Sequence, residues 1–279
     1  MKRKWLILPI VLLVLVVALM VFYGVCSARL SVSYGEKSVL EQEQTDDEAL
    51  LEAWRTVSDQ TAACEDYWNN KWPEWFGGLG VVENEGEYLT NVYLTQDTEE
   101  HRKEVCEAAG ASLRAYTATD VSWNQLRRGL KTVDSRKSLP GVNILSMGIN
   151  MERRVLRVYL SHRDFLTTLA LGTVHVPMEV VIIPVSPSVR SATRNVDGTV
   201  TLELGGTTYS NRITLELSTD AAFEEAVKTV ELPDNQAHVE LPDPGEGETW
   251  YVRAKAFKEV QGTTYQSEWG SAKTVKDAG

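Results

Sequence analysis

The feature that most constrains this chain is a run of 22 uncharged, mostly apolar residues from Trp5 to Cys26. An apolar helix of about 20 residues, rising about 1.5 Å per residue, can cross a hydrocarbon core of roughly 30 Å. A cleaved signal peptide usually has a shorter apolar run of about 7–15 residues. We therefore expect a retained transmembrane signal anchor over residues 5–26. Cleavage near Cys26-Ser27-Ala28 is the alternative.

Charge sets the expected orientation of this anchor. Basic residues occupy positions 2–4, immediately before the run, and basic flanks stay in the cytoplasm. Residues 1–4 are thus expected to form a cytoplasmic tail and the chain after Ser27 to be extracytoplasmic. The whole sequence has 39 acidic and 28 basic residues, a net charge of −11. This balance weighs against nucleic acid as a partner, because phosphate binding needs a basic face.

Beyond the anchor, the composition changes twice. Residues 27–46 are polar and acidic and are expected to form a stalk. Residues 47–184 begin with apolar side chains at steps of three and four, which predicts an amphipathic helix. Two hairpin patterns follow, over 80–94 and 148–160, and each leads into a helix. This alternation predicts an α+β extracytoplasmic domain with an antiparallel sheet and helices packed on one face.

Local signals mark some of the expected boundaries. Asp97 and Glu100 fit a capping box at the start of the helix after the first hairpin. Pro184 and Pro187 mark the end of the α+β domain. The last 90 residues then have period-two apolar stretches with turn residues between them, which predicts an all-β sandwich.

The segment 187–279 resembles a fibronectin type III domain of bacterial surface proteins. Residues 217–223 resemble the third strand of that family and its turn. Residues 247–257, Gly-Glu-Thr-Trp-Tyr-Val-Arg-Ala-Lys-Ala-Phe, resemble the sixth strand. Residues 262–265 resemble the final hairpin, and 267–271, Ser-Glu-Trp-Gly-Ser, resemble the step into the last strand. The resemblance implies a two-sheet sandwich.

Two positions depart from the fibronectin pattern. Leu204 stands where a core tryptophan is common, and Trp250 stands where a corner tyrosine is expected. An indole can donate a hydrogen bond but cannot reproduce the geometry of the phenol. The corner hydrogen bond is therefore in question.

Residues 62–170 have a second resemblance. The stretch Trp75-Phe76-Gly77-Gly78, followed by the hairpins and the capped helix, is similar in pattern to α+β domains related to the pro-regions of α-lytic-type serine proteases. The residues after this segment do not resemble a protease domain, so we do not assign a pro-region role to it.

The sequence contains few signals of catalysis. Gly-x-Ser-x-Gly, His-Glu-x-x-His and a glycine-rich phosphate loop are all missing from it. His101 and Cys106 are five positions apart and would lie about 140° apart around a helix, so they do not form a nucleophile–base pair. His162 and Asp164 flank a helix start, where an exposed cap is the favoured interpretation. We therefore expect no catalytic, cofactor-binding or metal-binding residues and no cofactor.

Cys64 and Cys106 form one candidate pair. Both lie on apolar faces of predicted helices, and an extracytoplasmic location would be oxidising. A disulfide closing this loop would stabilise the fold by about 3–4 kcal/mol in the chain-entropy model. The alternative is two buried thiols that pack as small apolar side chains.

Aromatic residues are concentrated between positions 67 and 76. Such rings stack on sugars and fill interface pockets. Trp68, Trp72, Trp75 and Phe76 are therefore a candidate contact surface. Packing inside a small α+β core is the favoured alternative.

Together these observations predict a single-pass, non-catalytic binding or adhesion protein of a bacterial cell surface. Its expected partner is an extracellular protein or cell-wall glycan. The alternative function is a regulator or inhibitor of an extracellular protease, which the pro-region resemblance suggests.

Overall fold

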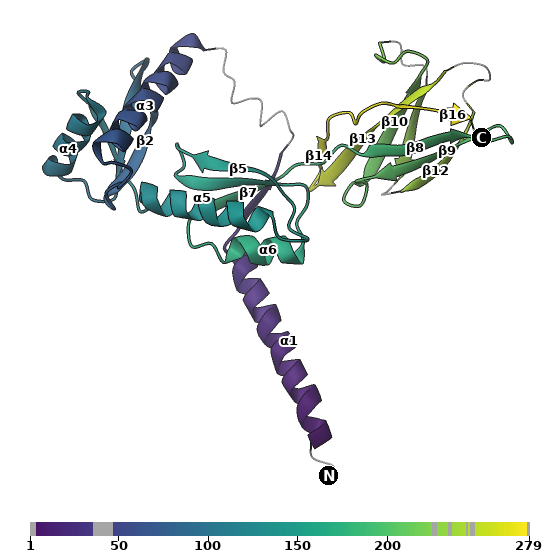
Figure 1. Cartoon of the computed structure of the whole chain (residues 1–279), viewed down its shortest axis with the longest axis horizontal. Helices are drawn as coiled ribbons and strands as arrows, with labels where there is room; N and C mark the ends of the chain where they lie inside the picture. Colours follow the sequence, from purple (N-terminus) through teal and green to yellow (C-terminus); the bar gives the residue numbers. More distant parts are fainter. Residues whose placement is uncertain are drawn as a thin grey trace. The chain divides into compact units, whose positions relative to one another are not determined.

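The computed structural model describes residues 4–35, 47–224, 228–233, 236–243, 245 and 249–277, with side chains in the first helix from Val14 onward (Figure 1). It divides into two compact units. The α+β unit comprises Met1–Ser33 and Glu43–Val181, and the sandwich unit comprises Tyr34–Gln42 and Ile182–Gly279.

Helix α1 covers Lys4–Ala28. Its large apolar side chains between Val14 and Val25 are 43–68% exposed, apart from the partly buried Tyr23. Among the described residues, no helix is both long enough and apolar enough to cross a membrane. The helix expected over residues 5–26 is therefore present, but the membrane span expected of it is not supported.

The end of α1 packs on helix α6, Phe165–Gly172. Cys26 is only 1% exposed, and a Cβ atom added to Gly172 would lie 2.4 Å from the Cβ atom of Cys26. The rings of Tyr23 and Phe165 stack with centroids 5.0 Å apart. Glycine at position 172 thus allows the two helices to touch.

From α3 onward, the α+β unit consists of two successive halves with the same order of elements, which is a helix, a hairpin, a second helix and a strand (Figure 1). The first half consists of α3 (Glu48–Tyr67), β2 (Phe76–Asn84), β3 (Glu87–Leu94), α4 (Glu99–Ala109) and β4 (Ala115–Ala118). The second half consists of α5 (Trp123–Lys137), β5 (Ile144–Asn150), β6 (Val155–Leu160), α6 and β7 (Met178–Ile182). The two hairpins expected from the sequence are both present, and each leads into a helix.

The strands of this unit form two sheets rather than the single antiparallel sheet that we expected. One sheet has the order β2-β3-β4 and the other β1-β7-β6-β5, where β1 is Ser31–Tyr34. Strands β3 and β4 are parallel, because α4 carries the chain back before β4 begins.

Strand β1 corrects part of the expected stalk. It lies within residues 27–46, and Val32 packs against the core of the second half. This apolar contact explains why a short polar-looking segment joins a sheet. Residues 27 and 28 of the expected stalk form the end of α1, and residues 36–46 lie outside the described residues.

Each half of the unit has its own apolar core, with the helices on one face of the sheet. In the first half, Val57 of α3 and Val105 of α4 belong to the same cluster as Val92 and Leu94 of β3. In the second half, Leu126 of α5 joins the side chains of β6 and α6. The helices and the sheet of each half therefore share one core.

The cap of α4 differs from the expectation by one residue. Thr98 is the N-cap, and its hydroxyl accepts a hydrogen bond of 3.2 Å from the backbone N–H of His101. Asp97 instead accepts two hydrogen bonds of 2.6 Å from Arg102, and this pairing lowers the pKa of the Asp97 carboxyl. The guanidinium therefore holds the carboxylate that was expected to cap the helix.

The sandwich unit consists of two packed sheets (Figure 1). One has the order β12-β9-β8-β16, formed by His238–Pro242, Thr199–Gly205, Ser188–Arg194 and Lys276–Asp277. The other has the order β11-β10-β13-β14, formed by Lys228–Pro233, Arg212–Ser218, Tyr251–Val260 and Thr263–Gln266, and β15 (Lys273–Thr274) pairs with β13. This is the fibronectin type III-like sandwich that the resemblance implied.

The two departures from the fibronectin pattern both lie in the sandwich core. Leu204 is 3% and Trp250 is 4% exposed. The indole N–H of Trp250 has no hydrogen-bond partner among the described residues. Among the described residues, Trp250 therefore does not form the hydrogen bond that a tyrosine makes at this corner of the fibronectin fold.

Candidate functional site on the open face of the sandwich

The outward side of the β11-β10-β13-β14 sheet carries a group of polar and aromatic side chains that contact one another. Alternate residues of β10 and β13 point into the core, including Leu215 and Ala254. Their neighbours point outward, because side chains alternate along a strand. We call the surface formed by these outward residues the open sheet face.

The register of β10 and β13 places an arginine opposite an aromatic ring and a glutamate opposite an arginine on this face. Arg212 stands opposite Phe257, and Glu216 stands opposite Arg253. The guanidinium carbon of Arg212 lies 4.3 Å from the centre of the Phe257 ring. Cross-strand pairs of this kind stabilise a sheet and fix the positions of their side chains.

Arg253 is the most constrained residue of the open sheet face. Its Nε and Nη2 atoms donate hydrogen bonds of 2.8 and 2.6 Å to Glu216. Its guanidinium carbon also lies 4.2 Å from the ring centre of Phe223 and 4.5 Å from that of Trp269. Lys255 lies 5.2 Å from the same Trp269 ring. Arg253 is thus held by two rings as well as by one carboxylate, whereas Lys255 contacts one of these rings and donates a hydrogen bond to Gln266.

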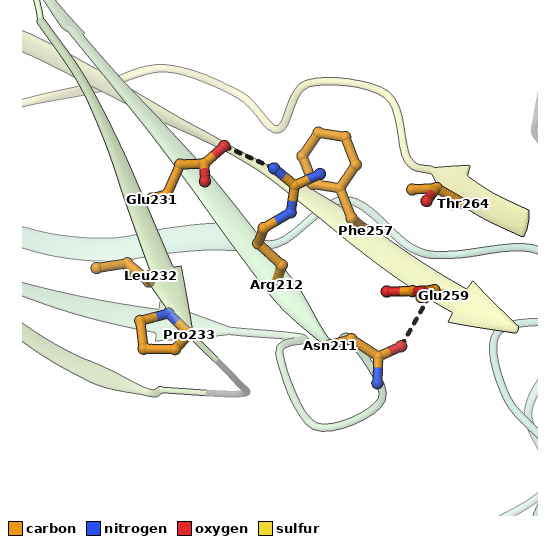
Figure 2. Close-up of a pocket in the computed structure, with 8 residues that line it drawn as sticks. All are labelled: Asn211, Arg212, Glu231, Leu232, Pro233, Phe257, Glu259 and Thr264. Carbon is orange, nitrogen blue, oxygen red and sulfur yellow. Dashed lines mark hydrogen bonds and ion pairs between the residues drawn. The ribbon is translucent and has the colours of Figure 1, made fainter. Parts of the chain in front are cut away.

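A shallow pocket of about 440 Å³ opens beside Arg212 (Figure 2). Glu231 of β11 accepts a 2.6 Å hydrogen bond from Arg212, and Phe257 lies behind the guanidinium. Asn211 accepts a 2.8 Å hydrogen bond from the backbone N–H of Glu259. The pocket is completed by Leu232, Pro233 and Thr264.

This arrangement is suited to binding. It offers a guanidinium, carboxylates, an amide, a hydroxyl and an aromatic ring around one opening, so it can accept a polar side chain or a sugar hydroxyl group. Within the described part of the chain, no three His, Cys, Asp or Glu side chains are grouped so as to hold a metal ion.

The aromatic residues predicted as a contact surface are divided between core and rim. Trp72 is 5% exposed and Phe76 is fully buried, and their rings stack at 5.3 Å. Trp68 is half-buried, and its indole N–H donates a 2.9 Å hydrogen bond to Glu104. Core packing therefore accounts for Trp72 and Phe76, and the partly buried Trp68 and Trp75 pack against the same core.

The fourth of these residues, Trp75, lies at the rim. It is half-buried and stacks on the His101 ring, with ring centres 4.1 Å apart. His101 is therefore engaged with an indole, and its Nδ1 atom lies 2.7 Å from the carbonyl oxygen of Gln96.

Cys64 and Cys106 are free thiols in the structure. Cys64 is fully buried between α3 and the sheet, whereas Cys106 is partly buried and lies 3.3 Å from the Tyr116 hydroxyl. Burial raises the pKa of the Cys64 thiol to about 12. The arrangement corresponds to the alternative in which the thiols pack as small apolar side chains.

His162 and Asp164 also have structural partners. Asp164 is the N-cap of α6 and accepts a 2.7 Å hydrogen bond from the backbone N–H of Thr167. His162 lies 3.3 Å from the Asp164 carboxylate, and burial is the main cause that lowers the pKa of His162. The predicted helix cap is present.

Sequence reasoning missed the open sheet face. A signal was available, because Arg212, Thr214 and Glu216 alternate with buried apolar residues, as do Arg253, Lys255 and Phe257. Alternation predicts which side chains point outward, but it does not predict which strands are neighbours.

Comparison with known proteins adds little. No family model matches this chain, and no curated protein matches it. An Fn3-like protein from Clostridium thermocellum is 17% identical with a TM-score of 0.24, over 34% of this chain and 93% of that one. Domains A168–A170 of titin are 16% identical with a TM-score of 0.23, over 36% of this chain and 35% of that one. The strand order described above remains the basis for the fold class.

Proposed function

We propose that this chain is a non-catalytic binding protein of a bacterial cell surface, which uses the open sheet face to hold an extracytoplasmic protein or cell-wall glycan. The observation that supports this most is the fixed geometry of that face. The guanidinium of Arg253 contacts two aromatic rings and pairs with Glu216. Side chains that are already ordered lose little conformational entropy on binding.

The composition of the face supports a contact role. Arginine and aromatic residues are enriched among the residues that dominate binding energy at interfaces. Arg212 and Phe257 combine both types at the edge of the pocket (Figure 2). We expect this pair to be the energetic centre of the contact.

Anchoring at the membrane is the second part of the proposal. It rests on the uncharged run of residues 5–26, on the basic residues before it, and on the exposed apolar side chains of α1. An exposed helical surface of this kind is favourable only where something apolar covers it.

Binding to intact bacterial cells and to purified cell-wall glycan tests the contact role. The wild-type chain is compared with Arg212→Glu and Phe257→Ala on the open sheet face, and with Arg190→Ala, an exposed residue of β8 in the other sheet. We expect the first two variants to bind at least about tenfold more weakly and the third to bind normally. Equal binding by all four proteins, or binding by none, would contradict the proposal.

The alternative role as a protease regulator rests on the pro-region resemblance alone. Incubation of the same purified chain with secreted bacterial proteases tests it. Unchanged proteolysis rates would remove this alternative.

A further inference from the structure

The α+β unit contains a buried arginine, two of whose nitrogen atoms lack an acceptor among the described residues. Arg154 ends the turn between β5 and β6 and is 6% exposed. Its Nε and Nη2 atoms are buried and have no hydrogen-bond partner among the described residues. Its Nη1 atom lies 3.6 Å from the sulfur of Met151, and the guanidinium lies 4.8 Å from the centre of the Tyr93 ring.

Other arginines show what this group usually binds. Arg102 and Arg253 use the same pair of atoms, Nε and Nη2, to hold the carboxylates of Asp97 and Glu216. Arg154 lacks such a carboxylate in the described part of the chain. Burial lowers the pKa of Arg154 to about 10, so the group remains charged at neutral pH. A buried charge without a partner is unfavourable, and an anion would relieve that cost.

Two residues next to this guanidinium, Gly78 and Met151, line a cavity of about 390 Å³. Gly78, Trp123 and Met151 line the cavity. A Cβ atom on Gly78 would lie 3.3 Å from Trp123 and 3.2 Å from Met151, and also 2.9 Å from Nη1 of Arg154. The guanidinium therefore adjoins the cavity wall at Gly78.

The rest of the cavity is mainly apolar. Helix α3 contributes Trp54, Val57 and Ala62, and β2 contributes Phe76 and Leu79. The indole N–H of Trp123 is a second buried donor without a partner among the described residues. Glu65 also lines the cavity, but its carboxylate lies 3.8 Å from Arg127.

We propose that this cavity binds a small carboxylic acid with an aromatic or aliphatic body, whose carboxylate pairs with Arg154. A guanidinium matches a carboxylate through two parallel hydrogen bonds, and the aromatic walls accept the body. Met151 both lines the cavity and contacts the guanidinium through its sulfur, and in this proposal its flexible thioether moves aside to admit the carboxylate. This site is in the α+β unit and does not depend on the proposed function of the sandwich.

Calorimetric titration of the full chain in detergent tests the site. The probes are benzoate and hexanoate, each compared with its neutral amide. We expect each acid to bind at least about tenfold more tightly than its amide, because a charge-assisted hydrogen bond contributes more than a neutral one. The variant Arg154→Met abolishes this preference. The matched control is Arg153→Met, which removes the same charge from the neighbouring exposed residue and keeps the preference.

A second variant covers the case in which Arg154→Met does not fold. Ala62 is exposed on α3 and lines the cavity, so Ala62→Phe fills the cavity without touching the guanidinium. We expect it to bind neither acid. The proposal is overturned if acid and amide bind the wild type equally, if neither binds at about 10 mM, or if Ala62→Phe binds the acids as well as the wild type does.

Discussion

The buried thiol of Cys64 makes the α+β unit less stable at alkaline pH. Burial raises the pKa of its thiol from 9.0 to about 12. Above pH 9 the unfolded chain loses this proton and the folded chain keeps it, so the free energy of unfolding falls as pH rises from 9 toward 12. We expect this thiol to account for a loss of about 2 kcal/mol between pH 9 and 10.5.

Urea unfolding of the wild type and of Cys64→Ala at both pH values measures this contribution. The variant lacks the thiol but keeps every tyrosine and lysine that also titrates in this range. The wild type should therefore lose more stability than the variant. Equal losses would show that Cys64 does not stay protonated in the fold.

A comparison of Gly78 with Gly86 separates the cost of backbone strain from the cost of a steric clash when a side chain is added. Both have positive φ, +118° and +83°. A Cβ on Gly86 meets nothing within 4 Å, whereas one on Gly78 meets Arg154, Met151 and Trp123. We expect Gly86→Ala to cost about 1 kcal/mol and Gly78→Ala at least about 2 kcal/mol in the free energy of unfolding. Chemical denaturation checks this, and equal costs would contradict the packing around Gly78.

Single residues show where sequence reasoning reaches its limit. The burial of Trp72 and Phe76 follows the favoured interpretation, because a small α+β core needs large apolar side chains. The cap at Thr98 could not be separated from Asp97, because the choice depends on where Arg102 points. The burial of Arg154 has no sequence signal, since it depends on a neighbouring strand.

At the scale of elements, the contact between α1 and α6 depends on Gly172. A Cβ there would lie 2.6 Å from Cα and 2.7 Å from the carbonyl oxygen of Cys26, so the backbone would have to shift. We expect Gly172→Ala to loosen the end of α1 and to increase trypsin cleavage after Arg29 several-fold, because cleavage follows local opening. Gly148→Ala, where a Cβ meets nothing within 4 Å, is the control. Equal cleavage of both variants would contradict this packing.

Elements with local signals were predicted better than their pairing. The hairpins and the period-two strands were expected, because turns and alternation lie within a few residues of each other. The parallel pairing of β3 with β4 and the recruitment of β1 were missed. Both depend on contacts between segments that are distant in the sequence.

At the scale of the whole molecule, the two units have separate cores. Leu215 is fully buried in the sandwich core and Leu156 in the second core of the α+β unit. We expect Leu215→Ala to destabilise only the sandwich unit and Leu156→Ala only the α+β unit, each by about 2–5 kcal/mol. Hydrogen exchange resolved by peptide measures this. Loss of protection in both units from either variant would contradict independent cores.

The sequence predicts a boundary between two domains because the spacing of apolar residues changes there. Helical spacing ends before Pro184 and period two follows, and the structure divides between Val181 and Ile182. The site could not be predicted in the same way. The open sheet face combines β10, β11 and β13. The sequence of a single strand does not predict which strands are its neighbours in the sheet.

Fractionation of cells that produce the full chain with a C-terminal tag tests the central claim most directly. The account predicts that the intact polypeptide stays with the membranes after a carbonate wash, is released only by detergent, and loses its tag when protease is added to intact cells. Intact chain in the soluble cytosolic fraction, with its tag protected, would contradict a surface protein anchored by α1.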